Sequence, residues 1–444
     1  MMKILMAVHH FPPTYTGGAE NRTLRTAAAM QERGHQVKVV CVESIHRGPE
    51  NGVDWVDDDY KGVDVRRLSF DLNKVPDRHR WEYDNPWVGD HLNTMIAEWQ
   101  PELFHLIGGY LLTSSVLNSA NTLGVPSVVS LTDFWFICPR ITMLRTNGDV
   151  SDLPIDSIQC VRCLGEAKRS FRWFGRYFPW LAENYWRRKK SAIIRHEMRI
   201  RTLVDRLNRV DAILAPSRFI RSMYVDAGIE PSRIIFSRQG MDITNMPAHE
   251  LRKNPTTHLR LGYIGQIDQH KGVHVLLQAL DLMKGKPLSL HVYGDMNHSP
   301  KYSKRLKEKY SSDRRIHFAG TFNGRSHLGD IYKDLDVVVV PSIWYENSPN
   351  VILEAQIFRT PVIASNLGGM AELVQDEENG LLFKTGDPRS LQQQILRIEE
   401  NPHLLNDLRS GITPVRTLTE EMDELDGIYH SVLANNKLGT EAVN

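Results

Sequence analysis

The stretch that decides the fold is residues 340–354, which read VPSIWYENSPNVILE. The run 337–340 is valine at every position, which is typical of a strand buried on both faces of a parallel sheet. A polar turn follows, and the segment after it has helical character. We expect Pro349 in the first turn of that helix, where the missing N–H of proline is tolerated. The pattern predicts a strand–turn–helix unit.

Two glutamates frame this turn. Glu346 lies at the carboxyl edge of the predicted strand, and Glu354 is expected about two turns into the helix. Helix N-termini attract anions, and ligands of open α/β sheets bind outside the carboxyl ends of the strands. A phosphate site beside two carboxylates that can hold hydroxyl groups fits a sugar nucleotide.

Apolar segments alternate with helical ones along the chain, which predicts βαβ units and parallel sheets. In the first half the predicted strands lie near 3–8, 37–42, 63–68, 103–107, 125–130, 211–215 and 233–236, and the helices near 19–33, 86–99, 113–123, 191–208 and 217–227. In the second half the predicted strands lie near 258–264, 288–293, 315–319, 336–340, 361–365 and 380–383, and the helices near 272–284, 300–310, 326–334, 349–358 and 388–398. The segment from Gly240 to Pro255 is polar, so we expect a linker at 245–257.

Composition narrows the class of protein. A chain of 444 residues predicts two or three domains, and 41% apolar with 24% charged residues is typical of a soluble globular enzyme. A net charge of +1 argues against a general nucleic-acid binder. The apolar runs are shorter than the about 18 residues of a membrane span, and the first one is too short for a signal peptide. Four cysteines do not form a disulfide scaffold, so we expect a cytoplasmic protein.

The pair Glu346 and Glu354 resembles the E-x(7)-E pattern of the family 4 glycosyltransferases. Other motifs match that family in order and spacing: Gly17-Gly18-Ala19-Glu20, Tyr263-Ile264-Gly265-Gln266, Lys271-Gly272, and the segments 360–365, 368–373 and 379–383. Together they cover nearly all of residues 260–385 and a smaller part of the first half.

The resemblance implies the GT-B fold, an α/β fold in which two doubly wound Rossmann-like domains face a cleft. We therefore expect an acceptor-side domain at 1–244 with an insertion at 134–190, and a donor-nucleotide domain at 258–413. In the family the last helix crosses back to the first domain. Residues 414–444 are expected to supply that helix and a frayed tail from Asn435.

The resemblance also implies retaining transfer of a hexose from a nucleoside diphosphate sugar to an acceptor hydroxyl. Such a site needs positive charge on the leaving diphosphate more than a strong nucleophile, and we expect no cofactor or metal to be required for catalysis. Residues 57–59 have the D-x-D spacing of metal-dependent sugar transferases of another fold. We interpret them as a solvated turn in a polar loop.

Similarity to the family assigns roles around the donor. Gly17 and Gly18 lie near the diphosphate, with an ordinary tight turn as the alternative. Lys271 neutralises the diphosphate. Many relatives carry an arginine where this chain has Gln266. Lys271 must therefore neutralise more of the charge of the diphosphate, or Arg238 or Arg140 must contribute.

Glu354 is expected to bind the ribose hydroxyls and Glu346 to lie near the donor sugar. The alternatives are a surface carboxylate and a helix-start acid. The backbone around Asn347, Ser348, Asn350 and Val351 is expected to touch the sugar or phosphate. Tyr293 ends a predicted strand and frames the base, or is part of a plain turn.

On the acceptor side Asp133 either orients a hydroxyl or acts as a base, or it caps the next helical turn. Many family members have a histidine just before this aspartate, and here Thr132 occupies the place. His9, His10 and His105 lie at strand ends where one of them can border the cleft. For each alone, a structural role is the alternative.

The insertion contains Cys138 and the pair Cys160 and Cys163. A C-x(2)-C pair with a third cysteine can clamp a structural zinc ion, with a histidine, an aspartate or Cys41 as fourth ligand. Free thiols are the alternative.

Residues 168–209 are strongly basic and carry aromatic side chains at helical spacing, interrupted by Pro179. One interpretation is peripheral contact with the anionic inner face of the cell membrane, which would make the acceptor a lipid-linked or growing envelope glycan. The other is a stripe packed on the first domain.

Two other functions are alternatives to glycosyl transfer. One is a non-catalytic GT-B protein that binds sugar nucleotides or acts as a scaffold, and the other is a sugar-nucleotide epimerase.

Overall fold

The computed structural model describes residues 1–244, 246, 258–322, 324 and 327–441, so the predicted linker 245–257 lies outside it apart from Met246. The described chain forms two compact units. The first unit contains Met1–Pro216, Ile220–Ser237 and the described residues from Met422 onward. The second unit contains Ser217–Phe219 and the described residues of Arg238–Glu421.

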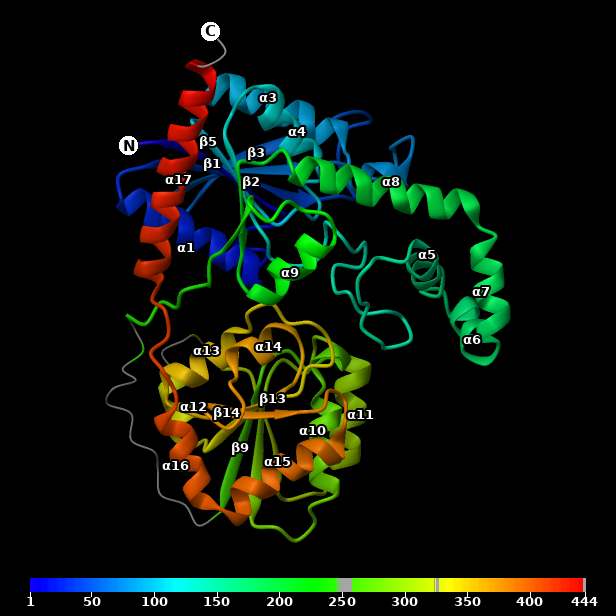
Figure 1. The fold of residues 1–444 in the computed structure, drawn as a ribbon, viewed down its shortest axis with the longest axis vertical. Coiled ribbons are helices and arrows are strands. Elements are labelled where there is room, and N and C mark those ends of the chain that lie inside the picture. Colours follow the sequence, from blue (N-terminus) through cyan, green and yellow to red (C-terminus); the bar gives the residue numbers. More distant parts are fainter. Residues whose placement is uncertain (245, 247–257, 323, 325–326, 442–444) are drawn as a thin grey trace. The chain divides into compact units, whose positions relative to one another are not determined.

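The first unit is built on an eight-stranded sheet of order β3-β4-β2-β1-β5-β6-β7-β8 (Figure 1). Its strands are β1 (Lys3–Val8), β2 (Gln36–Ser44), β3 (Asp54–Tyr60), β4 (Val63–Ser69), β5 (Leu103–Ile107), β6 (Ser127–Ser130), β7 (Ala212–Ala215) and β8 (Ile234–Phe236). All neighbouring pairs are parallel except β3 with β4. Five of the six residues of β1 are buried, as a central parallel strand requires.

The helices of this unit are α1 (Gly18–Glu32), α2 (Arg78–Trp81), α3 (Pro86–Trp99), α4 (Ser115–Thr122), α5 (Ser157–Gly165), α6 (Arg169–Tyr177), α7 (Pro179–Arg187), α8 (Lys190–Leu207), most of α9 (Arg218–Asp226) and most of α17 (Leu418–Glu441). The predicted break at Pro179 is confirmed, because α6 ends before it and α7 begins on it. The frayed tail predicted from Asn435 is wrong, because α17 continues to Glu441.

The interpretation of residues 57–59 as a turn is wrong. They lie in β3, an edge strand that pairs antiparallel with β4. Asp57 binds Arg66 with an Oδ1–Nε distance of 2.7 Å, and Asp58 binds Arg67 with an Oδ2–Nε distance of 2.9 Å. Opposite charges on facing strands therefore hold a segment that has little apolar surface.

His105 does not border a cleft, contrary to one of the interpretations above. It is buried in β5, where its two ring nitrogens contact the Tyr429 hydroxyl at 2.6 Å and the Ser130 hydroxyl at 2.9 Å. Burial lowers the pKa of His105 to about 3, so the ring is neutral. Its role is to fasten α17 to the sheet of the first unit.

The second unit has a six-stranded parallel sheet of order β11-β10-β9-β12-β13-β14. The strands are β9 (Leu259–Ile264), β10 (Leu288–Tyr293), β11 (Ile316–Gly320), β12 (Val337–Val340), β13 (Val362–Ser365) and β14 (Gly380–Phe383). The helices are α10 (Val273–Asp281), α11 (Pro300–Tyr310), α12 (Leu328–Lys333), α13 (Asn350–Ile357), α14 (Gly368–Leu373), α15 (Pro388–Glu400) and α16 (Pro402–Ser410), and a 3-10 turn spans Gln269–Lys271.

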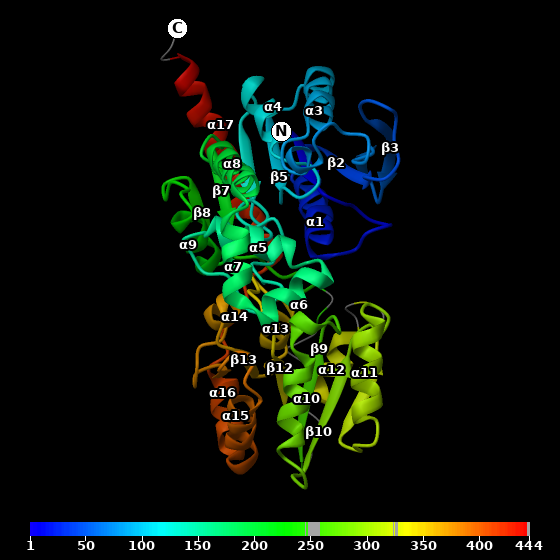
Figure 2. The ribbon, with the colours of Figure 1, turned by 90° about the vertical axis from the view of Figure 1, so that its right-hand side faces the viewer.

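Alternate residues of β12 face two separate cores. Val337 and Val339 pack with apolar residues of α10, α11, α15 and α16. Val338 and Val340 pack with those of α12, α13 and α14. Figures 1 and 2 show these helices on opposite faces of the sheet, which is the doubly wound arrangement expected from the sequence.

The decisive helix begins one residue later than expected. Pro349 is the N-cap of α13, and Glu354 is the fifth helical residue, so it lies about one turn into the helix instead of two. Helices α14 and α16 were not predicted. Among the described residues, no helix is both long enough and apolar enough to cross a bilayer.

A buried ion pair joins the amino ends of β9 and β12. The Asp336 carboxylate accepts hydrogen bonds from the backbone N, Nε and Nη2 of Arg260 at 3.0, 3.1 and 3.0 Å, and both side chains are less than a tenth exposed (9% and 8%). Removing Asp336 leaves the buried Arg260 guanidinium with only Asp334, which is 51% exposed and 3.6 Å from its Nη1, as an acidic partner among the described pairs.

We therefore expect Asp336→Ala to lower the free energy of unfolding of the second unit by about 3 to 5 kcal/mol. Urea denaturation of the purified chain, followed by circular dichroism, measures the change. Asp330→Ala is the matched control, since Asp330 forms an exposed pair with Lys333. Equal effects of the two substitutions would contradict the structural role of Asp336.

Candidate functional site

The site in the second unit is centred on Glu346, in the connection from β12 to α13. Glu346 is 9% exposed. Its Oε1 accepts hydrogen bonds from Lys271 Nζ at 2.6 Å, Trp344 Nε1 at 2.8 Å and Ser342 Oγ at 2.9 Å. The ammonium of Lys271 also lies 5.0 Å from the centroid of the Trp344 ring, a cation–π contact. One carboxylate oxygen thus fixes three side chains.

Charge decides the protonation of Glu346. Burial acts to raise the pKa of this carboxyl, but the charge and hydrogen bond of Lys271, with the donors of Trp344 and Ser342, outweigh burial. The net result is a pKa below the ordinary glutamate value. Glu346 is therefore an anion at neutral pH. An ammonium has three N–H donors, so Lys271 can bind Glu346 and still donate to a ligand.

Two glycines let the loops of this site approach closely. Gly272 has φ of +72°, and a Cβ there would lie 1.8 Å from the Pro341 carbonyl oxygen. A Cβ on Gly369 would lie 2.0 Å from the Asn347 carbonyl oxygen, and the Gly369 amide donates to the Glu346 carbonyl at 2.8 Å. The turn that carries Lys271 and the start of α14 therefore enclose the loop that carries Glu346.

The residues whose backbone is predicted to touch the sugar or phosphate extend into the first turn of α13. Asn350 Oδ1 accepts a hydrogen bond from Gln239 Nε2 at 3.0 Å, and the Val351 carbonyl accepts one from the Tyr332 hydroxyl at 3.3 Å. The Oγ of Ser348 is buried and has no hydrogen-bond partner among the described residues. That hydroxyl is free to bind a ligand at the start of the helix.

Glu354 is half-buried on α13, about one turn from the start of the helix. Burial raises the pKa of the Tyr332 hydroxyl well above its ordinary value, and the charge of Glu354 adds to this effect. Gln266 and Tyr293 lie at the carboxyl ends of the neighbouring strands β9 and β10. Gln266 is exposed, and its carbonyl accepts the Tyr263 hydroxyl at 2.6 Å.

The guanidinium of Arg238 is paired with a carboxylate of the protein. Its Nη2 lies 2.5 Å from Glu372 Oε1, and the second oxygen of Glu372 accepts the Phe219 amide at 3.1 Å. No pattern in the sequence predicts Glu372 as the partner of Arg238. The same holds for Trp344 and Ser342 as partners of Glu346, although a partly buried indole N–H signals a nearby acceptor.

The first unit places other predicted residues at the start of α1. Gly17 is the N-cap of this helix, and a Cβ on Gly18 would meet nothing within 4 Å. His9 Nε2 lies 3.3 Å from Glu20 Oε1. Burial acts to raise the pKa of Glu20, but the hydrogen bond and charge of His9 outweigh it, so the pKa is lowered.

The imidazole of His9 has a defined orientation. Its Nε2 donates to the carboxylate of Glu20, and its Nδ1 is buried with no partner among the described residues. His10 is different, because its Nδ1 donates to the Val42 carbonyl at 2.7 Å and its ring stacks on Tyr15 at 3.7 Å. His10 therefore has a structural role, whereas His9 presents an unused acceptor.

Asp133 organises the turn after β6. Its Oδ1 accepts the Trp135 amide at 2.7 Å and its Oδ2 accepts the Thr132 hydroxyl at 3.0 Å. Burial raises the pKa of Asp133, and these hydrogen bonds oppose the effect. The contacts support the capping interpretation directly. An acid or base role of Asp133 stays a prediction.

The cysteines of the insertion are free thiols in this structure. Burial raises the pKa of Cys138, and that of Cys160 to about 12. Among the described residues, no group of three or more histidine, cysteine or acidic side chains is placed to hold a metal ion. A structural zinc ion bound by Cys138, Cys160 and Cys163 stays a prediction.

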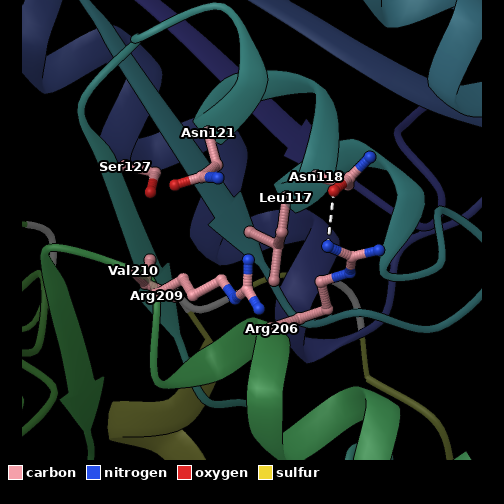
Figure 3. Close-up of a pocket in the computed structure, with 7 residues that line it drawn as sticks. All are labelled: Leu117, Asn118, Asn121, Ser127, Arg206, Arg209 and Val210. Carbon is pink, nitrogen blue, oxygen red and sulfur yellow. Dashed lines mark hydrogen bonds between the residues drawn. The ribbon is translucent and has the colours of Figure 1, made fainter.

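Figure 3 shows a depression in the first unit lined by Leu117, Asn118, Asn121, Ser127, Arg206, Arg209 and Val210. Ser127 begins β6 and Val210 precedes β7, so this depression lies at the amino ends of the strands. Open α/β sheets bind ligands at the opposite edge. Arg206 is engaged with the Asn118 side chain. The depression is thus separate from the predicted site.

Two family models match the chain. The model described as Glycosyltransferase Family 4 matches residues 16–245, more than half of the chain, and the model described as Glycosyl transferases group 1 matches residues 248–412. The chain belongs to glycosyltransferase family 4. The resemblance inferred from the motifs is confirmed.

Curated relatives match parts of this family 4 chain. The putative colanic acid biosynthesis glycosyltransferase WcaL of Salmonella typhimurium is 26% identical over 216 residues, which cover 47% of this chain and 52% of WcaL. The capsular polysaccharide biosynthesis glycosyltransferase CapM of Staphylococcus aureus is 26% identical over 190 residues, covering 40% and 47%. The chain thus spans about half the length of these relatives.

Solved structures match this family 4 chain over nearly its whole length. A glycosyltransferase from Rickettsia africae has a TM-score of 0.64 at 15% identity, covering 98% of this chain and 99% of that one. HepE of Anabaena, in complex with UDP and glucose, has a TM-score of 0.63 at 16% identity, covering 97% and 100%. These likenesses confirm the predicted GT-B fold.

We expect Lys271→Met to destabilise the family 4 chain in a pH-dependent way. The folded-state pKa of Glu346 is lowered, so the ion pair contributes at neutral pH and its contribution is lost as the pH falls through that pKa. In the variant, only the hydrogen bonds of Trp344 and Ser342 oppose burial, so the carboxyl takes up a proton more readily. The deficit in unfolding free energy, about 3 to 5 kcal/mol at neutral pH, should shrink toward pH of about 4.3.

Urea denaturation at several pH values measures this deficit. Lys304→Met is the control, because Lys304 pairs with Glu308 on the surface, where the side chains are 77% and 67% exposed. A deficit of Lys271→Met that stays constant across this pH range would mean that Glu346 is not held ionised by Lys271.

Proposed function

We propose that this protein is a retaining glycosyltransferase that moves a hexose from a nucleoside diphosphate sugar to an acceptor hydroxyl. The observation that carries the proposal is the buried assembly of Glu346, Lys271 and Trp344 at the carboxyl edge of β12. Ligands of open α/β sheets bind at this edge, and an oriented ammonium there stabilises the charge that develops on a departing diphosphate.

The proposed roles follow from the contacts. Lys271 keeps its bond to Glu346 and donates its remaining protons to the diphosphate. The Ser348 hydroxyl and the amides at the start of α13 bind phosphate or sugar oxygens, and Glu354 binds the ribose hydroxyls. Glu346 orients Lys271 and lies beside the hexose. No step in this scheme needs a covalent glycosyl-enzyme intermediate.

We assign acceptor activation to the first unit. His9 donates its Nε2 proton to Glu20, so the lone pair of Nδ1 is available to take a proton from the attacking hydroxyl. Glu20 fixes the tautomer and stabilises the imidazolium that forms. Gly17 leaves room for this carboxylate, since a Cβ there would lie 2.5 Å from Glu20 Oε2. Asp133, one loop away, orients the acceptor.

The acceptor is proposed to be a lipid-linked or growing envelope glycan, met at the inner face of the cell membrane. Relatives named for colanic acid and capsular polysaccharide biosynthesis support this class. The donor base is left to experiment, although uridine is the first to test because the HepE structures contain UDP or UDP-glucose.

The transfer reaction tests the proposal directly. We expect turnover of one UDP-, GDP- or ADP-hexose in the presence of a suitable acceptor extract, with the anomeric configuration retained in the product by proton NMR. Lys271→Ala should lower kcat by about 100-fold or more, because it removes the charge on the leaving group. The surface variant Lys304→Ala should have the activity of the parent.

Each other outcome of that assay decides against transfer. Donor binding without turnover for any donor and acceptor would identify a non-catalytic sugar-nucleotide-binding protein. Isomerised donor formed without an acceptor would identify an epimerase.

A second prediction concerns acceptor activation. Glu20→Gln should lower kcat by about 10 to 100-fold while the KM for the donor stays unchanged, because the amide no longer stabilises the imidazolium of His9. The pH profile of kcat should shift as well. If Glu20 only supports the start of α1, the melting temperature will fall and the pH profile will not move.

A further inference from the structure

Helices α6 and α7 form a helical hairpin with an apolar outer face. Five large side chains within nine consecutive residues are exposed: Trp173 (59%), Tyr177 (60%), Phe178 (46%), Trp180 (72%) and Leu181 (45%). We call these five residues the aromatic tip. A contiguous exposed apolar patch of this kind marks an interaction site.

The aromatic tip is not part of the hydrophobic core of the hairpin, which is formed by other residues. Phe171, Phe174 and Tyr185 pack against the buried cluster of Val161, Ala182 and Trp186. Gly175 lets α6 approach α5 closely, since a Cβ there would lie 2.0 Å from the Glu166 carboxylate. The inner face of the hairpin is therefore fixed, and the aromatic tip is left on the outside.

Ring contacts hold three residues of the aromatic tip in one arrangement. Trp173 and Tyr177 lie one turn apart on α6, with ring centroids 5.3 Å apart. Phe178, at the junction with α7, lies 6.1 Å from Trp173. Trp180 and Leu181 continue the surface onto the first turn of α7. Such a pre-formed platform loses little conformational entropy on binding.

The charge around the aromatic tip is strongly positive. Residues 168–190 contain eight lysines and arginines and one glutamate, which gives 8 − 1 = +7. The whole chain has a net charge of +1, so the rest of the chain carries 1 − 7 = −6. The basic side chains of Lys168, Arg169, Arg172 and Arg176 on α6 and of 187–190 at the end of α7 are all exposed. The basic excess of the protein is thus concentrated beside the aromatic tip.

We propose that the α6–α7 hairpin is an anchor for an anionic lipid surface. The aromatic tip enters the boundary between headgroups and acyl chains, where tryptophan and tyrosine are favoured. The flanking lysines and arginines bind the lipid phosphates. Lipid is the occupant that matches both features, because a bilayer presents an apolar layer directly beneath a layer of negative charge.

The anchor is connected to the proposed acceptor side of the first unit. Helix α8 runs from the hairpin to the sheet, as Figure 1 shows, and its Leu203 and Leu207 are buried. Arg199 of α8 donates to the Trp135 carbonyl at 2.5 Å, and the Trp135 amide binds Asp133. Resting on the proposed function, this link gives the anchor the role of bringing a lipid-linked acceptor to Asp133.

Co-sedimentation of the full chain with vesicles tests the anchor. We expect binding to phosphatidylcholine vesicles that contain phosphatidylglycerol, little binding to pure phosphatidylcholine, and weaker binding at high salt. The double variant Trp173→Ala with Trp180→Ala should reduce the partition coefficient at least tenfold. Trp55→Ala is the matched control, since Trp55 is 51% exposed on β3, outside the hairpin.

Three further results keep the test decisive. The double variant must retain the circular dichroism spectrum and the melting temperature of the parent. Equal vesicle binding by the parent and the double variant, or no binding by the parent, would overturn the anchor. A parent dimer that becomes monomeric in the double variant would identify the aromatic tip as a contact between copies. Vesicle binding is read without turnover, so failure of the proposed function does not affect it.

Discussion

The ion pair between Lys271 and Glu346 is the interaction on which the second unit's site depends. It joins two segments 75 residues apart, and the Ile343 amide, which donates to the His270 carbonyl at 2.9 Å, closes the same contact through the backbone. A buried carboxylate without its cation is strongly unfavourable. The fold therefore holds both loops in one place before any ligand arrives, and pre-organisation of this kind is what electrostatic stabilisation of a transition state requires.

The same interaction sets the charge of the site. Lys271 is balanced by Glu346, and Arg238 is balanced by Glu372. Where many family members carry an arginine, Gln266 adds no charge. Under the proposed function, a diphosphate would share each of these cations with a glutamate, so the neutral donors of the Ser348 hydroxyl and the α13 amides would contribute a larger part of its binding.

Sequence patterns predict the parts of this protein that local chemistry determines. Strands β10 and β14 and helices α3 and α11 have the predicted bounds, because prolines open the two helices and both strands are runs rich in apolar residues. Strand β3 escaped prediction, since its segment has three consecutive acids and is held by Arg66 and Arg67 from the next strand. Local periodicity carries no information about such partners.

The same limit applies to the site. The position of Glu346 at the end of β12 follows from its sequence context, but the pairing of Arg238 with Glu372 joins residues 134 apart and is decided by the packing of α14. The expectation that His105 lies at a strand end is wrong, because it is the third of the five residues of β5, and its ring contacts Tyr429, 324 residues away. Sequence predicts the edge of each sheet at which a ligand is expected, and tertiary packing decides which side chains are available there.

The first unit offers an explanation for Thr132. Its hydroxyl donates to Asp133, so this position stabilises the turn after β6 and supplies no imidazole. The imidazole that the first unit presents at this edge is His9, at the end of β1. Under the proposed function, the Nδ1 of His9 acts as the base and the carboxylate of Glu20 fixes the tautomer of the ring. That base lies at the carboxyl end of β1, on the same edge of the sheet as the turn after β6 that carries Thr132 and Asp133.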